Sequence, residues 1–162
     1  MAAAAAAGSL ECIRQLIASG SDVSQVGRYR QDALDKVLLL DEGATEMVRE
    51  LLSAWAKRPD GKERANQALR ECMSDEDKRL DVVQEVLKWA DASARGPSRT
   101  GKDDPGGASA LDLAAIWGRG AGVVESLIEA GADANATNAK GMSAINMLIF
   151  NPFVAKSHLS GF

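Results

Sequence analysis

Two sets of apolar residues recur along this chain with one shared period, which limits the possible folds more than any single motif. Four short apolar clusters end at Ile17, Leu52, Leu87 and Ile128. Successive members of this set are 35, 35 and 41 residues apart. A second set consists of Leu34, Leu69, Leu111 and Ile145, with separations of 35, 42 and 34 residues. Because both sets lengthen at the same copy, the sequence predicts a repeat architecture.

Within each copy the apolar residues follow helical spacing. Val48, Leu51 and Leu52 stand at i, i+3 and i+4, and the other clusters repeat this spacing. We therefore expect each copy to be a pair of short antiparallel helices whose apolar faces are buried only when copies stack. The expected helices in the middle and last copies cover Ala33–Leu40, Glu46–Trp55, Ala68–Met73, Leu80–Leu87 and Ala144–Phe150.

The segment from Gly107 to Ile145 carries the most specific pattern in the chain. It has a glycine before a first apolar run, an alanine pair, a glycine break, a second apolar run and then Gly-Ala-Asp-Ala-Asn. This segment resembles the ankyrin repeat. The matching positions are Gly107, Leu111, Leu113, Ala114, Ala115, Gly118, Val123, Val124, Leu127, Ile128, Gly131, Ala132, Asp133 and Asn135.

The resemblance implies an all-α fold, an ankyrin-type solenoid of helix-turn-helix repeats joined by short finger loops. It is clear over 107–149 and 4–24, and degenerate over 28–93, where the period carries it. We expect a single ankyrin-repeat domain over 1–162. Its repeats are expected at about 1–27, 28–61, 62–101, 102–136 and a partial copy at 137–150, while the tail 151–162 matches no part of the pattern.

The composition favours an intracellular, cytoplasmic protein without a membrane span. The formal net charge of −4 gives no basic surface for nucleic acid. The longest apolar runs are far shorter than the roughly 20 residues that cross a bilayer. Cys12 and Cys72 cannot form a disulfide framework, and because both lie within apolar helical patterns, we expect two buried free thiols.

No motif in the chain predicts catalysis. The segment Gly96–Asp103 has the GxxxxGK of a phosphate-binding loop, but Asp103 replaces the hydroxyl residue that holds magnesium. The one histidine, His158, cannot by itself supply the three or four ligands of the usual zinc site, and a Ser-His-Asp triad would depend wholly on this tail residue. We therefore expect no enzyme activity, no catalytic residue, no cofactor and no metal; a nucleotide-dependent switch through 96–103 is the less favoured alternative.

The resemblance implies that a protein partner binds to the finger tips and to the inner face of the first helices. Carried over position by position, the candidate partner-binding residues are Arg28, Tyr29, Gln31, Leu39, Leu40, Arg64, Asn66, Ile116, Trp117, Lys140 and Met142. Large apolar and aromatic side chains are common anchors of interfaces. The alternative for the apolar members is that they simply complete the core.

Basic residues gather in the expected fingers, whereas the opposite turns at Asp41–Glu46 and Ser74–Asp81 are acidic. This distribution favours an acidic or mixed-charge protein partner. We expect a monomeric, non-catalytic interaction module rather than an oligomer. The alternative is a piece of a longer ankyrin-repeat scaffold or a self-associating assembly unit. This alternative is favoured by the first copy, which has no hairpin or first-helix start before Ala4, and by the partial last copy.

Overall fold

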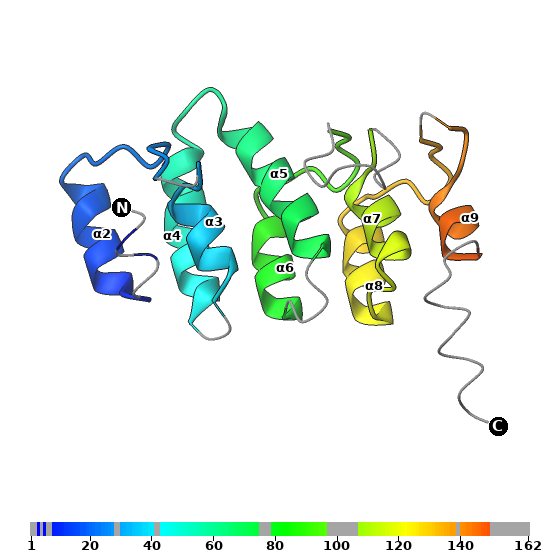
Figure 1. Ribbon diagram of the computed structural model, residues 1–162, viewed down its shortest axis with the longest axis horizontal. Coiled ribbons are helices and arrows are strands. Elements are labelled where there is room, and N and C mark those ends of the chain that lie inside the picture. The colour runs from blue at the N-terminus through cyan, green and yellow to red at the C-terminus, as the bar shows by residue number, and fades with distance from the viewer. Residues whose placement is uncertain are drawn as a thin grey trace. The chain divides into compact units, whose positions relative to one another are not determined.

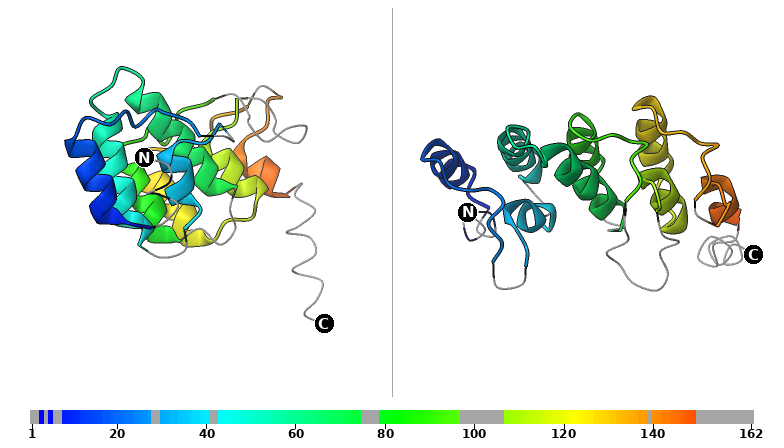
Figure 2. Two further views of the ribbon diagram at one scale, coloured as in Figure 1. Left: turned by 60° about the vertical axis from the view of Figure 1, so that its left-hand side comes forward. Right: turned by 90° about the horizontal axis from the view of Figure 1, so that it is seen from above.

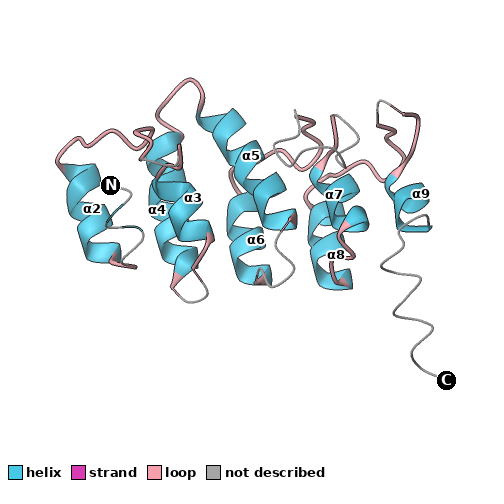
Figure 3. Cartoon of the chain, in the orientation of Figure 1, coloured by secondary structure: helices cyan, strands magenta, loops and turns pink. Residues whose placement is uncertain are grey.

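The computed structural model describes residues 3, 5, 8–27, 30–40, 43–74, 79–96, 107–138 and 140–149 (Figure 1). Within these ranges every regular element is a helix (Figure 3). The only extended pairing in these ranges is an isolated antiparallel bridge between Thr137 and Ser143. The expectation of an all-α fold is therefore confirmed. The chain divides into two compact units, Met1–Ala68 with Lys78–Ala90 and Leu69–Asp77 with Asp91–Phe162, called units 1 and 2 below.

Unit 1 is built around its longest complete helix, α4 (Figure 2). Helix α4 packs against α2, α3 and α6, and its side chains Val48, Leu51 and Leu52 are completely or almost completely buried. This three-sided contact buries the apolar stripe that the sequence places at i, i+3 and i+4. The helices of unit 1 are α2 (Leu10–Ala18), α3 (Ala33–Leu38), α4 (Ala44–Trp55), α6 (Leu80–Leu87) and the first part of α5 (Gly61–Met73).

Four polar contacts in unit 1 join residues that are 36 positions apart in the chain. The donor–acceptor distances lie between 2.7 and 3.1 Å. A constant offset is what stacked copies of about 35 residues produce, because each side chain meets its neighbour one copy further on. The pairs are Arg14–Glu50, Thr45–Asp81, Arg49–Glu85 and Arg58–Asp22.

Unit 2 contains α7 (Ala110–Ile116), α8 (Ala121–Glu129) and α9 (Ala144–Ile149). Helix α7 packs against both α8 and α9. The second helices of both units end where the sequence predicts, with Gly20 at φ 80° after α2 and Gly131 at φ 93° after α8. Glycine reaches this left-handed conformation without steric cost, which stops the helix.

One helix boundary differs greatly from the sequence prediction. Helix α5 begins at Gly61, whereas the apolar pattern predicted a start at Ala68. The prediction was wrong because the extra turns contain lysine, glutamate, arginine and glutamine, which are good helix formers but carry no apolar signal. Only a short turn therefore joins α4 to α5, and no finger loop separates them.

The two cysteines differ in exposure. Cys72 is buried in α5 as predicted, but Cys12 is exposed on α2, so the expectation of two buried thiols is wrong for Cys12. Its neighbour Ile13 is completely buried and takes the core-facing position. Consecutive residues of a helix point about 100° apart, and therefore Cys12 faces solvent.

Candidate partner-binding surface

Three of the connections that follow a second helix close on the same turn. In each, the first carboxylate oxygen of an aspartate accepts a hydrogen bond of 2.9 Å from the backbone N–H two residues later. This Asx turn fixes the base of the finger loop. The pairs are Asp22–Ser24, Asp91–Ser93 and Asp133–Asn135.

The turn at Asp91 was not predicted from the glycine-based pattern. Trp89 occupies the place that Gly20 and Gly131 have in the other two turns, so this copy does not match the glycine-based pattern. The preceding helix α6 ends without a left-handed residue. The aspartate followed two residues later by a small polar residue was the available signal, because Asp-x-Ser occurs at both Asp22 and Asp91.

The connection between α4 and α5 replaces a finger with an arginine contact. Arg58 donates to Asp22 at 3.1 Å and to Asp60 at 3.0 Å, and its guanidinium carbon lies 5.2 Å from the centre of the Trp55 ring. Hydrogen bonds from the side chain and backbone of Ser24, with the charge of Arg58, lower the pKa of Asp22. Asp22 is therefore an ionised anchor for the first finger.

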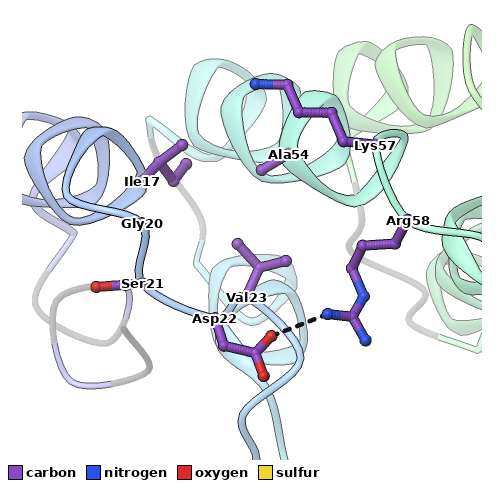
Figure 4. A pocket seen from close by; sticks show the side chains of 8 residues that line it. All are labelled: Ile17, Gly20, Ser21, Asp22, Val23, Ala54, Lys57 and Arg58. Atoms are coloured by element: carbon purple, nitrogen blue, oxygen red, sulfur yellow. Dashed lines mark hydrogen bonds and ion pairs between the residues drawn. The ribbon is translucent and has the colours of Figure 1, made fainter.

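A shallow pocket of about 320 Å³ lies beside this contact (Figure 4). Its walls are the last turns of α2 and α4 and the segment from Gly20 to Val23. In Figure 4 the Arg58 side chain points toward Asp22, whereas Lys57 extends away from it. The pocket is small and lined by both polar and apolar groups, so it can accept a single side chain of a partner.

The structure places the candidates of unit 1 around α3. Gln31 is half-buried before the helix, and its Oε1 accepts a hydrogen bond of 2.6 Å from Lys36. Leu39, at the other end of α3, is 63% exposed, and the next residue, Leu40, is half-buried. The candidates Arg28 and Tyr29 lie outside the described residues.

The finger position predicted for Arg64 and Asn66 is wrong. Both residues lie inside α5, and each is only 7% exposed. Arg64 donates to both carboxylate oxygens of Asp32, at 2.8 and 3.0 Å, and to Asp35 at 2.8 Å. Because the early start of α5 turns Arg64 toward the first turn of α3, this side chain joins two copies internally.

In unit 2 the candidates lie at the end of α7 and in the following finger. Ile116 and Trp117 are half-buried where α7 ends, at the positions that Leu39 and Leu40 occupy after α3. Lys140 is exposed and Met142 is half-buried. Asn138 accepts hydrogen bonds from the backbone N–H groups of Lys140 and Met142, at 2.9 and 3.0 Å, and so holds the finger in shape.

The second helices carry a different kind of electrostatic contact. The carboxylate of Glu85 is buried on α6 and accepts two hydrogen bonds from Arg49 of α4, at 3.0 and 2.9 Å, and one from Lys88 at 2.7 Å. The hydrogen bond from Arg49 is the largest cause that lowers the pKa of Glu85 to about 2. This site joins α4 to α6 and has a structural role.

The other sites considered in the sequence provide no catalytic or metal-binding arrangement among the described residues. Most of the phosphate-loop-like segment 96–103, together with His158, lies outside the described residues. Among the residues that are described, no group of three His, Cys, Asp or Glu side chains is arranged to hold a metal ion. None of the described helices is long and apolar enough to cross a membrane.

Comparison with known proteins gives one family match. Residues 106–139 match the family model described as the ankyrin repeat. This range contains α7, α8 and the Asp133 turn, which form one helical pair with its finger. No curated protein matches the chain. Residues 106–139 are therefore similar to an ankyrin repeat, and every regular element in the described part of the chain is a helix.

Proposed function

We propose that this chain binds a protein partner through its finger loops and the ends of its first helices. Ankyrin repeats are in general protein–protein interaction modules and typically non-catalytic. The observation that carries the proposal is the exposure of Leu39. The three large apolar residues before it in α3, Leu34, Val37 and Leu38, are at most 5% exposed, whereas Leu39 is 63% exposed.

The corresponding end of α7 supports the same surface in unit 2. Ile116 and Trp117 keep part of their surface exposed there, although the alanines before them are buried. A large apolar side chain at the rim of a helix offers area that a partner can bury, and tryptophan is a frequent anchor of interfaces. Each unit therefore presents an apolar contact at the same position of its first helix.

The fingers supply charge beside these apolar contacts. Arg30 and Lys140 are exposed in their fingers, and Lys57 and Lys62 are exposed around the α4–α5 turn. Arg58, Arg64 and Arg95 instead form ion pairs within the protein. The exposed cations favour an acidic or mixed-charge partner surface, with electrostatic attraction contributing mainly to the association rate.

A capture experiment with matched variants tests the proposal. The double variant Leu39→Asp with Trp117→Ala is expected to retain at least tenfold less of the specifically captured protein than the unaltered chain. The control is Ile128→Asp, because Ile128 is also an exposed apolar residue but belongs to second helix α8. Equal loss in the control, or no loss in the double variant, would contradict the proposed surface.

Charge reversal tests the chemistry of the partner separately. Arg30→Glu with Lys140→Glu is expected to weaken binding severalfold and to flatten its dependence on salt, since surface charges are screened within about 10 Å at 0.1 M salt. Binding measured between 50 and 300 mM salt distinguishes this result from misfolding. An unchanged salt dependence would argue against an acidic partner while leaving the apolar contact intact.

A further inference from the structure

Helix α9 of unit 2 has one packed face and one exposed apolar face. Ala144 and Met147 are buried, and the helix packs against α7. The other apolar side chains of α9, Ile145, Leu148 and Ile149, are 63%, 41% and 70% exposed. Contiguous apolar exposure of this kind marks a surface at which another protein segment or another molecule binds.

The same positions are covered in the preceding helix. Helices α7 and α9 are 34 residues apart in register, and the glycines that precede them, Gly107 and Gly141, have φ angles of 71° and 72°. The residues of α7 equivalent to Ile145, Leu148 and Ile149 are only 4%, 1% and 8% exposed. They are Leu111, Ala114 and Ala115. This face of a first helix is therefore a packing face.

The order of helices along the chain indicates which segment provides the cover. Helix α3 packs against α4, and α7 packs against α8 as well as α9, so the segment that directly follows each of these first helices supplies part of its packing. The segment that follows α9 consists of residues 150–162, which lie outside the described residues. By this connectivity, the missing neighbour of α9 is encoded directly after it.

The sequence of that segment fits an apolar face. It contains no aspartate or glutamate, and five of its thirteen residues are large and apolar. These residues are Phe150, Phe153, Val154, Leu159 and Phe162. Thirteen residues reach up to about 43 Å when extended, whereas a helix of six residues is about 9 Å long. The segment is therefore long enough to return over the whole exposed face of α9.

We propose that residues 150–162 dock on the face of α9 formed by Ile145, Leu148 and Ile149. The alternatives are a second copy of the chain and a separate partner. Both must give up translational and rotational freedom on binding, whereas a segment attached at Ile149 is present at an effective concentration of about millimolar or higher. The covalent neighbour therefore occupies the face before any other molecule at micromolar concentration.

A spin label placed in the segment tests this docking directly. The variant is Ser160→Cys with Cys12→Ser, which removes the exposed cysteine and leaves Cys72 buried. With a nitroxide at position 160, the amide signals of Ile145, Leu148 and Ile149 are expected to lose more than half of their intensity. The loss should persist when the labelled chain is diluted with an excess of unlabelled, isotopically silent chain.

The matched control keeps the label and changes the apolar side chains of the segment. Phe153→Ser, Leu159→Ser and Phe162→Ser together should restore the α9 signals. Broadening that appears only between labelled and unlabelled chains would assign the face to a second copy and overturn the proposal. Absence of broadening in every sample would overturn it as well.

Thermal unfolding gives an independent measurement. Ile149→Ser and the three serine substitutions in the segment should each lower Tm by a few degrees, and combining them should lower it by less than the sum. Because Ile149 is 70% exposed in the described structure, its substitution leaves the packed side of α9 intact. Strictly additive shifts would mean that the segment does not contact Ile149.

Discussion

The first turns of α3 in unit 1 and α7 in unit 2 are capped by the same arrangement of hydrogen bonds, but the two caps carry different numbers of charged residues. Both helices begin with a capping box, in which the N-cap side chain accepts from the N3 backbone and the N3 aspartate accepts from the N-cap backbone. In α3 the N-cap is Asp32 and the N3 residue is Asp35, whereas in α7 they are Ser109 and Asp112. An arginine then pairs with the N3 aspartate in each unit.

The arginines differ in origin and burial. Arg64 comes from α5, after α3 in the chain, and its side chain is 7% exposed. Arg95 comes from the finger before α7, and its side chain is 29% exposed. A buried aspartate at the N-cap adds a second negative charge, which must have a cation beside it, whereas a serine needs none. The choice of cap residue thus decides how strongly each unit depends on its arginine.

Removing Arg64 is expected to have the largest effect on this comparison. Arg64→Ala leaves the buried Asp32 and the half-buried Asp35 without this cation, and we expect the free energy of unfolding to fall by about 3–5 kcal/mol. Urea denaturation followed by circular dichroism measures the change. As a control, Asp32→Asn with Asp35→Asn in the Arg64→Met background should recover much of the loss. A cost below about 1 kcal/mol would mean that the buried pair is not what stabilises the cap.

The next largest expected effect is that of acid, which should change the stability of the two units differently. The pKa of Glu85 is lowered from 4.5 to about 2, so its contribution is complete above pH 4.5 and is lost as the pH falls toward 2. We expect Glu85→Gln to destabilise unit 1 by about 2 kcal/mol at pH 7, and by much less near pH 2, because Arg49 is half exposed and solvent screens the pair. The equivalent residue in unit 2 is Ser126, which cannot titrate in this range.

The fluorescence of Trp55 and Trp89 reports on unit 1, and that of Trp117 reports on unit 2. Denaturation curves at pH 7 and near pH 2 with single-tryptophan variants therefore measure the acid effect in each unit. If Glu85→Gln cost the same at both pH values, the ion pair with Arg49 would not be the source of the stability.

Arg95→Ala is expected to cost less than Arg64→Ala, about 1–2 kcal/mol. The loss has two parts, the bond of 3.1 Å to Asp112 and the bond of 2.8 Å to the carbonyl of Gly107. Asp112 still accepts a hydrogen bond from the N–H of Ser109, so the carboxylate keeps one of its hydrogen-bond partners. Arg95→Lys, which preserves the charge, should recover some of the stability measured in urea. A cost equal to that of Arg64→Ala would remove the distinction between the units.

The smallest expected change concerns the serine caps. Ser109→Ala removes the acceptor for the N–H of Asp112, a contact of 3.2 Å, and should cost about 1 kcal/mol. Ser9→Ala at α2 is the matched control, because its contact to the N–H of Cys12 is longer, at 3.4 Å, and is exposed. Thermal melts should show a smaller shift for Ser9→Ala. The reverse order would show that burial does not decide the value of these caps.

The helices were largely predictable because their apolar spacing is local. Leu80–Leu87 was predicted with the bounds that α6 has, and the predicted helix Glu46–Trp55 differs from α4 only in its start, which lies at Ala44. The first half of α5 was not predictable in this way, since its only buried apolar residue before Ala68 is Ala65. Helix propensity alone is a weak signal over such a short segment.

The contacts of the candidate surface were less accessible to sequence reasoning. Arg64 is a charged residue of the kind expected in a finger loop. Its partners lie 29 and 32 positions earlier in the chain, and no local sequence pattern predicts such pairs. Lys140 differs because its exposure follows from the hairpin turn that Asn138 closes within the same finger. Short-range hydrogen bonds could therefore be predicted from the sequence, whereas the long-range ion pairs became evident only from the structure.

The constant offset of 36 residues between paired side chains in unit 1 has a consequence for how such a chain can change its length. Inserting one residue between Glu50 and Arg58 would change the offset of the Asp22–Arg58, Thr45–Asp81 and Arg49–Glu85 pairs together. Gain or loss of a complete copy keeps every such partnership among the copies that remain. Duplication of whole copies is therefore the least disruptive way for a protein of this kind to grow.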